Sequence, residues 1–136
     1  MTQLRHLVLL LAAFFLAAPL AAHAMVRPPE PATPTGTYNV TPMPAGTTCT
    51  IVIVPGAFCG PNGPWIGYVF LNGEPVGPET MVIMRSSSGG YVWQNSKVGP
   101  RTGLNGAGTF KWNNGHYDSE VTQGDNTGTK RTLTPQ

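Results

Sequence analysis

Short apolar runs separated by turn-forming residues dominate this sequence and most constrain its fold. The runs are CTIVIV (49–54), WIGYVFL (65–71), TMVIMR (80–85), GYVWQN (90–95) and GTFKWN (108–113). Clusters of Gly, Pro, Asn or Ser separate them, and Asn-Gly, the strongest short-range hairpin signal, begins at residues 62, 72, 105 and 114. No helical periodicity of apolar residues persists along the chain. The pattern predicts an all-β fold, a small antiparallel sandwich or barrel built from consecutive hairpins.

The N-terminus is typical of a secretory signal peptide. Arg5 precedes an uninterrupted apolar run, and the run ends at Ala22-His23-Ala24, where small residues occupy the positions that a signal peptidase inspects. The run is shorter than the roughly 20 apolar residues that a membrane span needs. We therefore expect residues 1–24 to be removed, a periplasmic or secreted location, and no integral membrane segment in the mature protein.

Two regions are expected in the mature chain. Residues 25–36 contain four prolines and no apolar periodicity, which predicts a linker or a disordered arm. Residues 37–136 are expected to form a single all-β domain, as their length suggests. The whole chain has 8 Lys and Arg residues against 6 Asp and Glu, for a net charge of +2. Because nucleic-acid binding needs clustered basic residues, no nucleic-acid partner is expected.

The chain contains two cysteines, Cys49 and Cys59, in the segment CTIVIVPGAFC. An even number of cysteines in an exported protein usually forms disulfides. We read the segment as a strand, a turn at Pro55-Gly56 and a short return strand, which would bring the two sulfur atoms together. The sequence therefore predicts one structural disulfide between Cys49 and Cys59.

The clearest hairpin centres on Asn114-Gly115, a pair that suits a type I′ turn. This turn places Trp112 opposite Tyr117 on the neighbouring strand. Because side chains alternate along a strand, one face of the hairpin is expected to be largely aromatic and apolar. Its members are Gly108, Phe110, Trp112, Tyr117, Ser119 and Val121. The opposite, charged face is expected to hold Thr109, Lys111, Asn113, His116, Asp118 and Glu120.

Two further hairpins share this aromatic and Asn-containing pattern. A turn at Asn72-Gly73 places Phe70 opposite Pro75, and a weaker turn is expected at Asn95-Ser96. The run WIGYVFL (65–71) is apolar at successive positions, which predicts a central strand buried on both faces. The likeness of the three units fits either an internal repeat or independent use of the same hairpin chemistry.

Five aromatic residues are the candidate ligand-binding residues. They are Trp65, Trp93, Trp112, Tyr91 and Tyr117. Two interpretations stay open for these rings: they make the core of a small domain that has few other large side chains, or some form an exposed platform on which a ligand stacks. Trp65 follows the turn-rich segment GPNGP, and it is the best candidate for an exposed ring in a loop.

The sequence offers little for catalysis. After removal of the signal peptide His116 is the one remaining histidine, and it is expected to be a solvated surface residue beside a turn. A zinc site needs at least three protein ligands, so no metal site is predicted, and no cofactor is expected. Scattered carboxylates show no diagnostic spacing, and we therefore expect a protein that is not an enzyme.

These observations favour an exported binding protein. The first hypothesis is binding of a cell-envelope glycan or another carbohydrate through aromatic side chains. The alternative is a protein-interaction role, as an inhibitor, an immunity-type protein or a subunit of a surface or secretion assembly. In that case the hairpin tip at 54–58 or an open sheet edge would meet an extracytoplasmic partner, and the Pro-rich arm could tether a neighbour.

Overall fold

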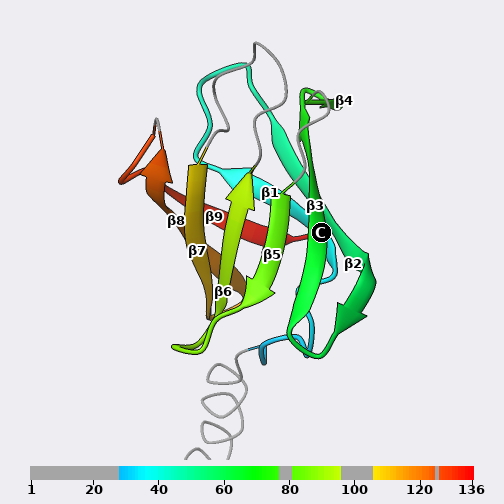
Figure 1. Ribbon diagram of the computed structural model, residues 1–136. Coiled ribbons are helices and arrows are strands. Elements are labelled where there is room, and N and C mark those ends of the chain that lie inside the picture. The colour runs from blue at the N-terminus through cyan, green and yellow to red at the C-terminus, as the bar shows by residue number, and fades with distance from the viewer. Residues whose placement is uncertain (1–27, 77–80, 96–105, 125) are drawn as a thin grey trace, which may run out of the picture.

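The computed structural model describes residues 28–76, 81–95, 106–124 and 126–136. These residues form nine strands and no helix (Figure 1). In chain order the strands are β1 (Gly36–Thr41), β2 (Cys49–Gly60), β3 (Gly63–Leu71), β4 (Glu74–Pro75), β5 (Met81–Arg85), β6 (Tyr91–Asn95), β7 (Gly106–Asn113), β8 (His116–Gly124) and β9 (Lys130–Pro135). The all-β prediction is confirmed.

Eight of these strands close into an antiparallel barrel (Figure 1). Their order around the barrel is β2-β1-β9-β8-β7-β6-β5-β3, and β3 pairs back onto β2. The two-residue β4 extends the sheet beside β3 as an extra strand. Two pairs of barrel strands are not consecutive in the sequence: β1 with β9, and β3 with β5, between which β4 lies. All other strands that pair around the barrel follow each other in the sequence, so the barrel is built from consecutive hairpins as predicted. Among the described strands closure leaves little open edge beyond β4 for a partner to extend.

The β7–β8 hairpin has the predicted register. Asn114 and Gly115 have φ angles of 53° and 102°, and both are positive, as a type I′ turn requires. Trp112 lies opposite Tyr117 in the ladder. The burial pattern agrees, since the predicted aromatic face turns towards the barrel interior and the predicted charged face towards solvent. Two residues with positive φ thus set the register of the strands on either side of them.

The β3–β4 hairpin agrees with the sequence in its turn but not in its burial. Asn72 and Gly73 have φ angles of 51° and 79°, and Phe70 lies opposite Pro75 as expected. However, the outward side chains of β3 are only partly buried, so the strand is not covered on both faces. The predicted Asn95-Ser96 turn lies partly outside the described residues.

The predicted disulfide is wrong. β2 runs from Cys49 to Gly60 without reversing, and Pro55 pairs with Trp65 in the ladder instead of starting a turn. Ten residues of extended strand span roughly 30 Å, far beyond the roughly 7 Å between Cα atoms that a disulfide allows. Both thiols are free, Cys49 buried in the barrel and Cys59 partly exposed beyond a bulge in β2. The Pro55-Gly56 pair lies at the start of that bulge. A Pro-Gly pair occurs in bulges as well as in hairpin turns, so the sequence alone does not tell the two apart.

The two thiols are expected to react at different rates. Burial raises the pKa of the Cys49 thiol and so lowers its fraction of reactive thiolate. We expect iodoacetamide to modify Cys59 in the native protein at least about tenfold faster than Cys49, and both residues after unfolding. Peptide mass spectrometry of the alkylated protein measures this. If neither cysteine of the native protein reacts until a reductant is added, the two cysteines form a disulfide and the free thiols described here are wrong.

The barrel interior is filled with side chains. Inward positions alternate along the strands, and an eight-stranded barrel is just wide enough for side chains to fill it. The buried apolar residues of the barrel strands include Tyr38, Val40, Ile51, Ile53, Trp65, Val69, Met81, Ile83, Tyr91, Trp93, Phe110, Tyr117 and Leu133. Aromatic rings make up a large share of this core, which decides where the candidate ligand-binding residues lie.

Candidate functional site

The structure places the five candidate aromatic residues in or against the barrel core. Trp65, Trp93, Tyr91 and Tyr117 are buried, and Trp112 is partly buried against them. The expectation that Trp65 is an exposed ring in a loop is wrong: it occupies an inward position of β3 and is only 2% exposed. The five rings therefore form no outer platform. Their role in ligand binding stays a prediction, and it would require a ligand that approaches from one end of the barrel.

Tyr117 lies at the centre of a group of rings in mutual contact. We call this group the aromatic cluster, and its members are Tyr38, Trp65, Tyr91, Phe110, Trp112 and Tyr117. The Tyr117 ring contacts those of Trp112, Phe110, Tyr38 and Tyr91, with centroid distances of 4.9, 5.2, 5.7 and 5.9 Å. All four contacts are edge-on, with interplanar angles of 63° to 81°, a geometry that aromatic pairs favour. Strands β1, β6, β7 and β8 are thereby joined through one side chain.

Polar atoms are buried within the aromatic cluster. The hydroxyls of Tyr91 and Tyr117 are buried and interact with each other, and neither makes a hydrogen bond of ordinary length. The indole nitrogen of Trp93 in β6 is also buried without a hydrogen-bond partner among the described residues. The Arg85 guanidinium lies over the Tyr91 ring, 5.2 Å from its centroid, and over the Trp65 ring at 5.7 Å. Cation–π contacts at these distances hold the guanidinium over the two rings. One end of the barrel therefore combines rings with unsatisfied hydrogen-bond donors.

Burial raises the pKa of Tyr38, Tyr91 and Tyr117, because a phenolate in the barrel would lack solvation. Below about pH 9 the folded and unfolded chains both keep these protons, so stability does not depend on them. Above that pH the unfolded chain loses protons first, and unfolding becomes more favourable. We expect the three tyrosines together to lower the free energy of unfolding by roughly 2–3 kcal/mol between pH 9 and pH 10.5. Urea unfolding at both pH values measures this, and an unchanged midpoint would contradict the burial of the hydroxyls.

The Pro-rich segment 28–35, here called the N-terminal arm, lies against this end of the barrel (Figure 1). The sequence predicted a linker or a disordered arm, whereas these residues make specific contacts. Three barrel side chains donate hydrogen bonds to backbone carbonyl oxygens of the arm: Trp112 Nε1 to Pro28 (3.3 Å), Arg85 Nη2 to Ala32 (3.1 Å) and Tyr38 Oη to Pro34 (2.8 Å). Pro34 is itself fully buried. The arm therefore covers the aromatic cluster.

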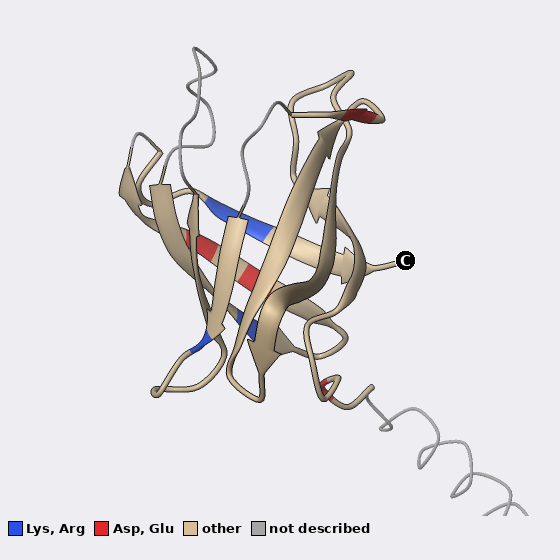
Figure 2. Cartoon of the chain, turned by 45° about the vertical axis from the view of Figure 1, so that its right-hand side comes forward, with Lys and Arg blue, Asp and Glu red and all other residues tan. Residues whose placement is uncertain are grey.

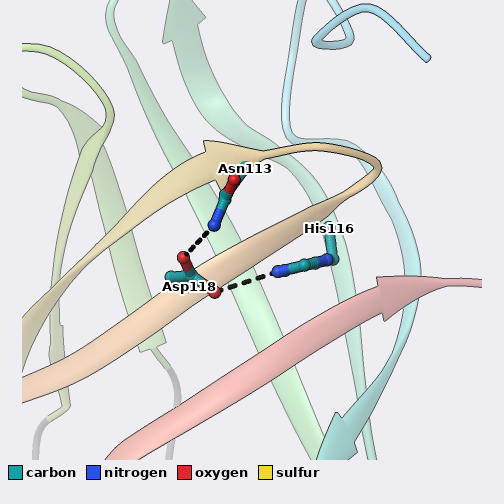
Figure 3. A network of polar contacts seen from close by, with 3 residues as sticks. All are labelled: Asn113, His116 and Asp118. Carbon is teal, nitrogen blue, oxygen red and sulfur yellow. Dashed lines mark hydrogen bonds and ion pairs between the residues drawn. The ribbon is translucent and has the colours of Figure 1, made fainter. Parts of the chain in front are cut away.

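His116 belongs to a small polar network at the β7–β8 turn (Figure 3). Asp118 lies between two neighbours: its Oδ1 is 3.0 Å from His116 Nε2, and its Oδ2 accepts a hydrogen bond of 2.9 Å from Asn113 Nδ2. The network sits on the outward face of the hairpin, as the sequence predicted for His116. Among the described residues no group of three or more His, Cys, Asp or Glu side chains could hold a metal ion.

The outer surface of the barrel has a charged side on β7, β8 and β9 (Figure 2). A shallow open groove runs over these strands, and its charged lining residues are Lys111, Asp118, Glu120, Lys130 and Arg131. Both signs are interspersed, so the groove presents no single-sign field to a charged ligand.

The opposite side of the barrel, on β2, β3, β5 and β6, is apolar. Arg85, at the end of β5, is the one charged residue in these four strands. It is exposed, and its guanidinium lies over the Tyr91 and Trp65 rings. Four outward side chains are between 37% and 44% exposed: Tyr68, Val82, Met84 and Val92. Partly buried outward residues lie beside them, namely Val52, Val54, Ile66 and Phe70. Cross-strand pairing of Val52 with Tyr68, of Ile66 with Val82 and of Met84 with Val92 makes these eight residues contiguous, and we call them the apolar outer face.

Comparison with known proteins gives no identification: no protein family, no curated protein and no solved structure matches this chain. Within the described part of the chain no helix is long and apolar enough to cross a membrane. The function of this protein must therefore be inferred from its own residues. Sequence reasoning missed Tyr38 and Arg85 at the covered end of the barrel, and the one available signal was the Pro-rich segment directly before the first strand.

Proposed function

We propose that this protein is an exported, non-catalytic binding protein that docks another extracytoplasmic protein. The apolar outer face carries the proposal. The largest contiguous apolar patch on a monomeric protein typically covers about 300–600 Å² and often marks an interaction site. Four adjacent strands whose outward positions carry no charge suit a partner surface that is itself apolar at its centre.

The apolar outer face is smaller than one side of a standard protein interface. Eight outward side chains offer an estimated ~400 Å², about half of the ~800 Å² that each partner buries in a standard interface. The partner must therefore also contact neighbouring structure. Phe58, near the end of β2, is 93% exposed and extends the apolar surface along that strand. The expected hairpin tip at 54–58 does not form, because β2 continues through this segment, but Phe58 offers a partner an exposed ring there.

Glycan binding through ring stacking has less support. Stacking needs an accessible ring face, and the exposed large rings among the described residues are Phe58 and Tyr68. The tryptophans, which suit sugar stacking best, are all buried or partly buried. A carbohydrate would have to bind at the end of the barrel that the N-terminal arm covers.

The experiment compares two charge-insertion variants of the mature protein. The test variant is Val82→Lys with Met84→Lys on the apolar outer face, and the control variant is Thr122→Lys with Gln123→Lys on the charged side. A photo-crosslinker at Tyr68 is expected to capture one stoichiometric partner in the native envelope. The test variant should lose that partner while the control retains it, with thermal midpoints alike.

Three results would count against the proposal. A capture that survives in the test variant would show that the apolar outer face is not the docking surface. Crosslinks to this chain alone would assign the face to a second copy. A saturating quench of tryptophan fluorescence by a polysaccharide, abolished by Trp112→Ala, would instead support glycan binding.

A further inference from the structure

We propose that the arm-covered end of the barrel is a recognition site for extended proline-rich peptide segments, and that the protein's own N-terminal arm occupies it. This site is separate from the apolar outer face. It is built from the aromatic cluster, the Arg85 guanidinium and the donors on Tyr38 and Trp112. A protein that supplies such a segment would bind by displacing the arm.

The arm has the chemistry of a polyproline ligand. Prolines occupy four of its first seven positions, 28, 29, 31 and 34. Such a chain favours the polyproline II conformation, which has no internal backbone hydrogen bonds and leaves its carbonyl groups free to accept them. The arm forms no strand with the barrel, and its contacts to the barrel are carbonyl acceptors and proline rings. These are features that proline-rich recognition uses in general.

The barrel end has the complementary chemistry. Three side chains beside or within the aromatic cluster donate hydrogen bonds to carbonyl groups of the arm, namely those of Trp112, Arg85 and Tyr38. The Pro34 ring is buried at one end of the arm. At the other end Pro28 lies beside the β7–β8 turn: a Cβ atom added at Gly115 would be in ordinary contact with the Pro28 ring, 3.7 Å away. The aromatic rings and the hydrogen-bond donors beside them can therefore bind both ends of an extended segment.

The arm leaves part of this site unused. The hydroxyls of Tyr91 and Tyr117 are buried at the covered end, where they interact with each other and with the charge of Glu30 in the arm. Neither makes a hydrogen bond of ordinary length to the arm. Both rings contact Tyr38 or Arg85, the residues that hold the arm. A segment with a carbonyl or carboxylate group in reach of these hydroxyls would make bonds that the arm does not make. The arm is therefore a replaceable occupant, which acts as an autoinhibitory contact through its high effective concentration.

The test weakens the binding of the arm to the barrel in the full mature protein. Pro28→Gly, Pro31→Gly and Pro34→Gly together remove its polyproline preference. A fluorescent peptide with the sequence of residues 28–35, PPEPATPT, serves as the probe in fluorescence anisotropy. We expect the three-proline variant to bind this peptide roughly tenfold or more tightly than the unchanged protein does. The same peptide with every proline replaced by alanine should not bind.

Two further variants localise the site. Trp112→Phe, added to the three-proline variant, keeps a ring but removes the indole donor, and it should weaken peptide binding about fivefold. Tyr68→Ala on the apolar outer face should leave peptide binding unchanged, which separates this site from the docking surface proposed above. A folded three-proline variant that does not bind the peptide would overturn the proposal.

A second measurement covers the case in which the three-proline variant does not fold. A spin-labelled PPEPATPT peptide is added in excess to the unchanged mature protein, and the proton signals of Trp112 and Tyr38 are followed by NMR. Exchange of the peptide with the arm should broaden these signals selectively and leave those of Val82 sharp. Equal broadening throughout, or none at millimolar peptide, would refute the site.

Discussion

Replacing Tyr117 by alanine is expected to lower the free energy of unfolding by about 3–5 kcal/mol. Tyr117 is fully buried, and its ring contacts four other rings, so the substitution removes apolar contact and leaves a cavity at the centre of the aromatic cluster. A small domain has a total stability of only about 5–15 kcal/mol. The variant is therefore expected to be marginally folded.

Urea unfolding followed by circular dichroism measures this effect. Tyr117→Phe is the matched control, because it keeps the ring and removes a hydroxyl that makes no hydrogen bond of ordinary length in the described structure. That change should alter stability by less than about 1 kcal/mol and can raise it. Tyr68→Ala is a second control, because it removes an aromatic ring from the outer surface of the barrel and leaves the interior unchanged. A loss of less than about 1 kcal/mol for Tyr117→Ala would show that the rings do not form the interior.

Replacing Gly108 by alanine is expected to cost about 3 kcal/mol, the next largest effect. Gly108 is buried in β7 opposite Trp93 of β6, and the indole packs over the place where a side chain would be. An added Cβ would lie 2.6 Å from Trp93 Cζ2 and would also collide with the backbone oxygen of Glu120. Neither atom can move aside cheaply, because one belongs to a packed ring and the other to a β-ladder.

The control for this substitution is Gly60→Ala in β2. A Cβ there would meet its nearest neighbour at 3.8 Å, an ordinary contact, so stability should change by less than about 1 kcal/mol. Thermal unfolding of the two variants side by side gives the comparison. If both glycines tolerate alanine equally, the packing of Trp93 across β7 is not as described.

Local features of the fold could be predicted from the sequence because their chemistry is local. The β7–β8 register follows from two residues, Asn114 and Gly115, that adopt positive φ with little strain. Alternation then assigned Trp112 and Tyr117 to one face and Lys111 to the other. Each of these inferences spans only a few residues, so no knowledge of distant strands was needed.

Features that depend on distant contacts could not be predicted. Closure pairs β1 with β9, where Tyr38 lies opposite Pro135, and nothing local distinguishes this barrel from a sandwich. Pro55-Gly56 looks like a turn, but the ladder between β2 and β3 continues past it and places Cys49 far from Cys59. The disulfide inference failed at that point.

The candidate site was predicted by residue type but not by position. The sequence singled out the aromatic residues, yet it could not show that inward alternation collects them in the interior. Arg85 was missed because its importance arises only when the end of β5 comes to lie over Tyr91 and Trp65. The arm was read as a linker because its hydrogen bonds go to strands up to 84 residues away.

Nuclear Overhauser contacts in the mature protein test the central claim, that the aromatic residues fill a closed barrel whose end the N-terminal arm covers. We predict contacts between the Tyr38 and Tyr117 rings, 5.7 Å apart, and between the Trp112 indole proton and Pro28. Narrow random-coil signals for residues 28–35, with no contact between the Tyr38 and Tyr117 rings, would contradict it.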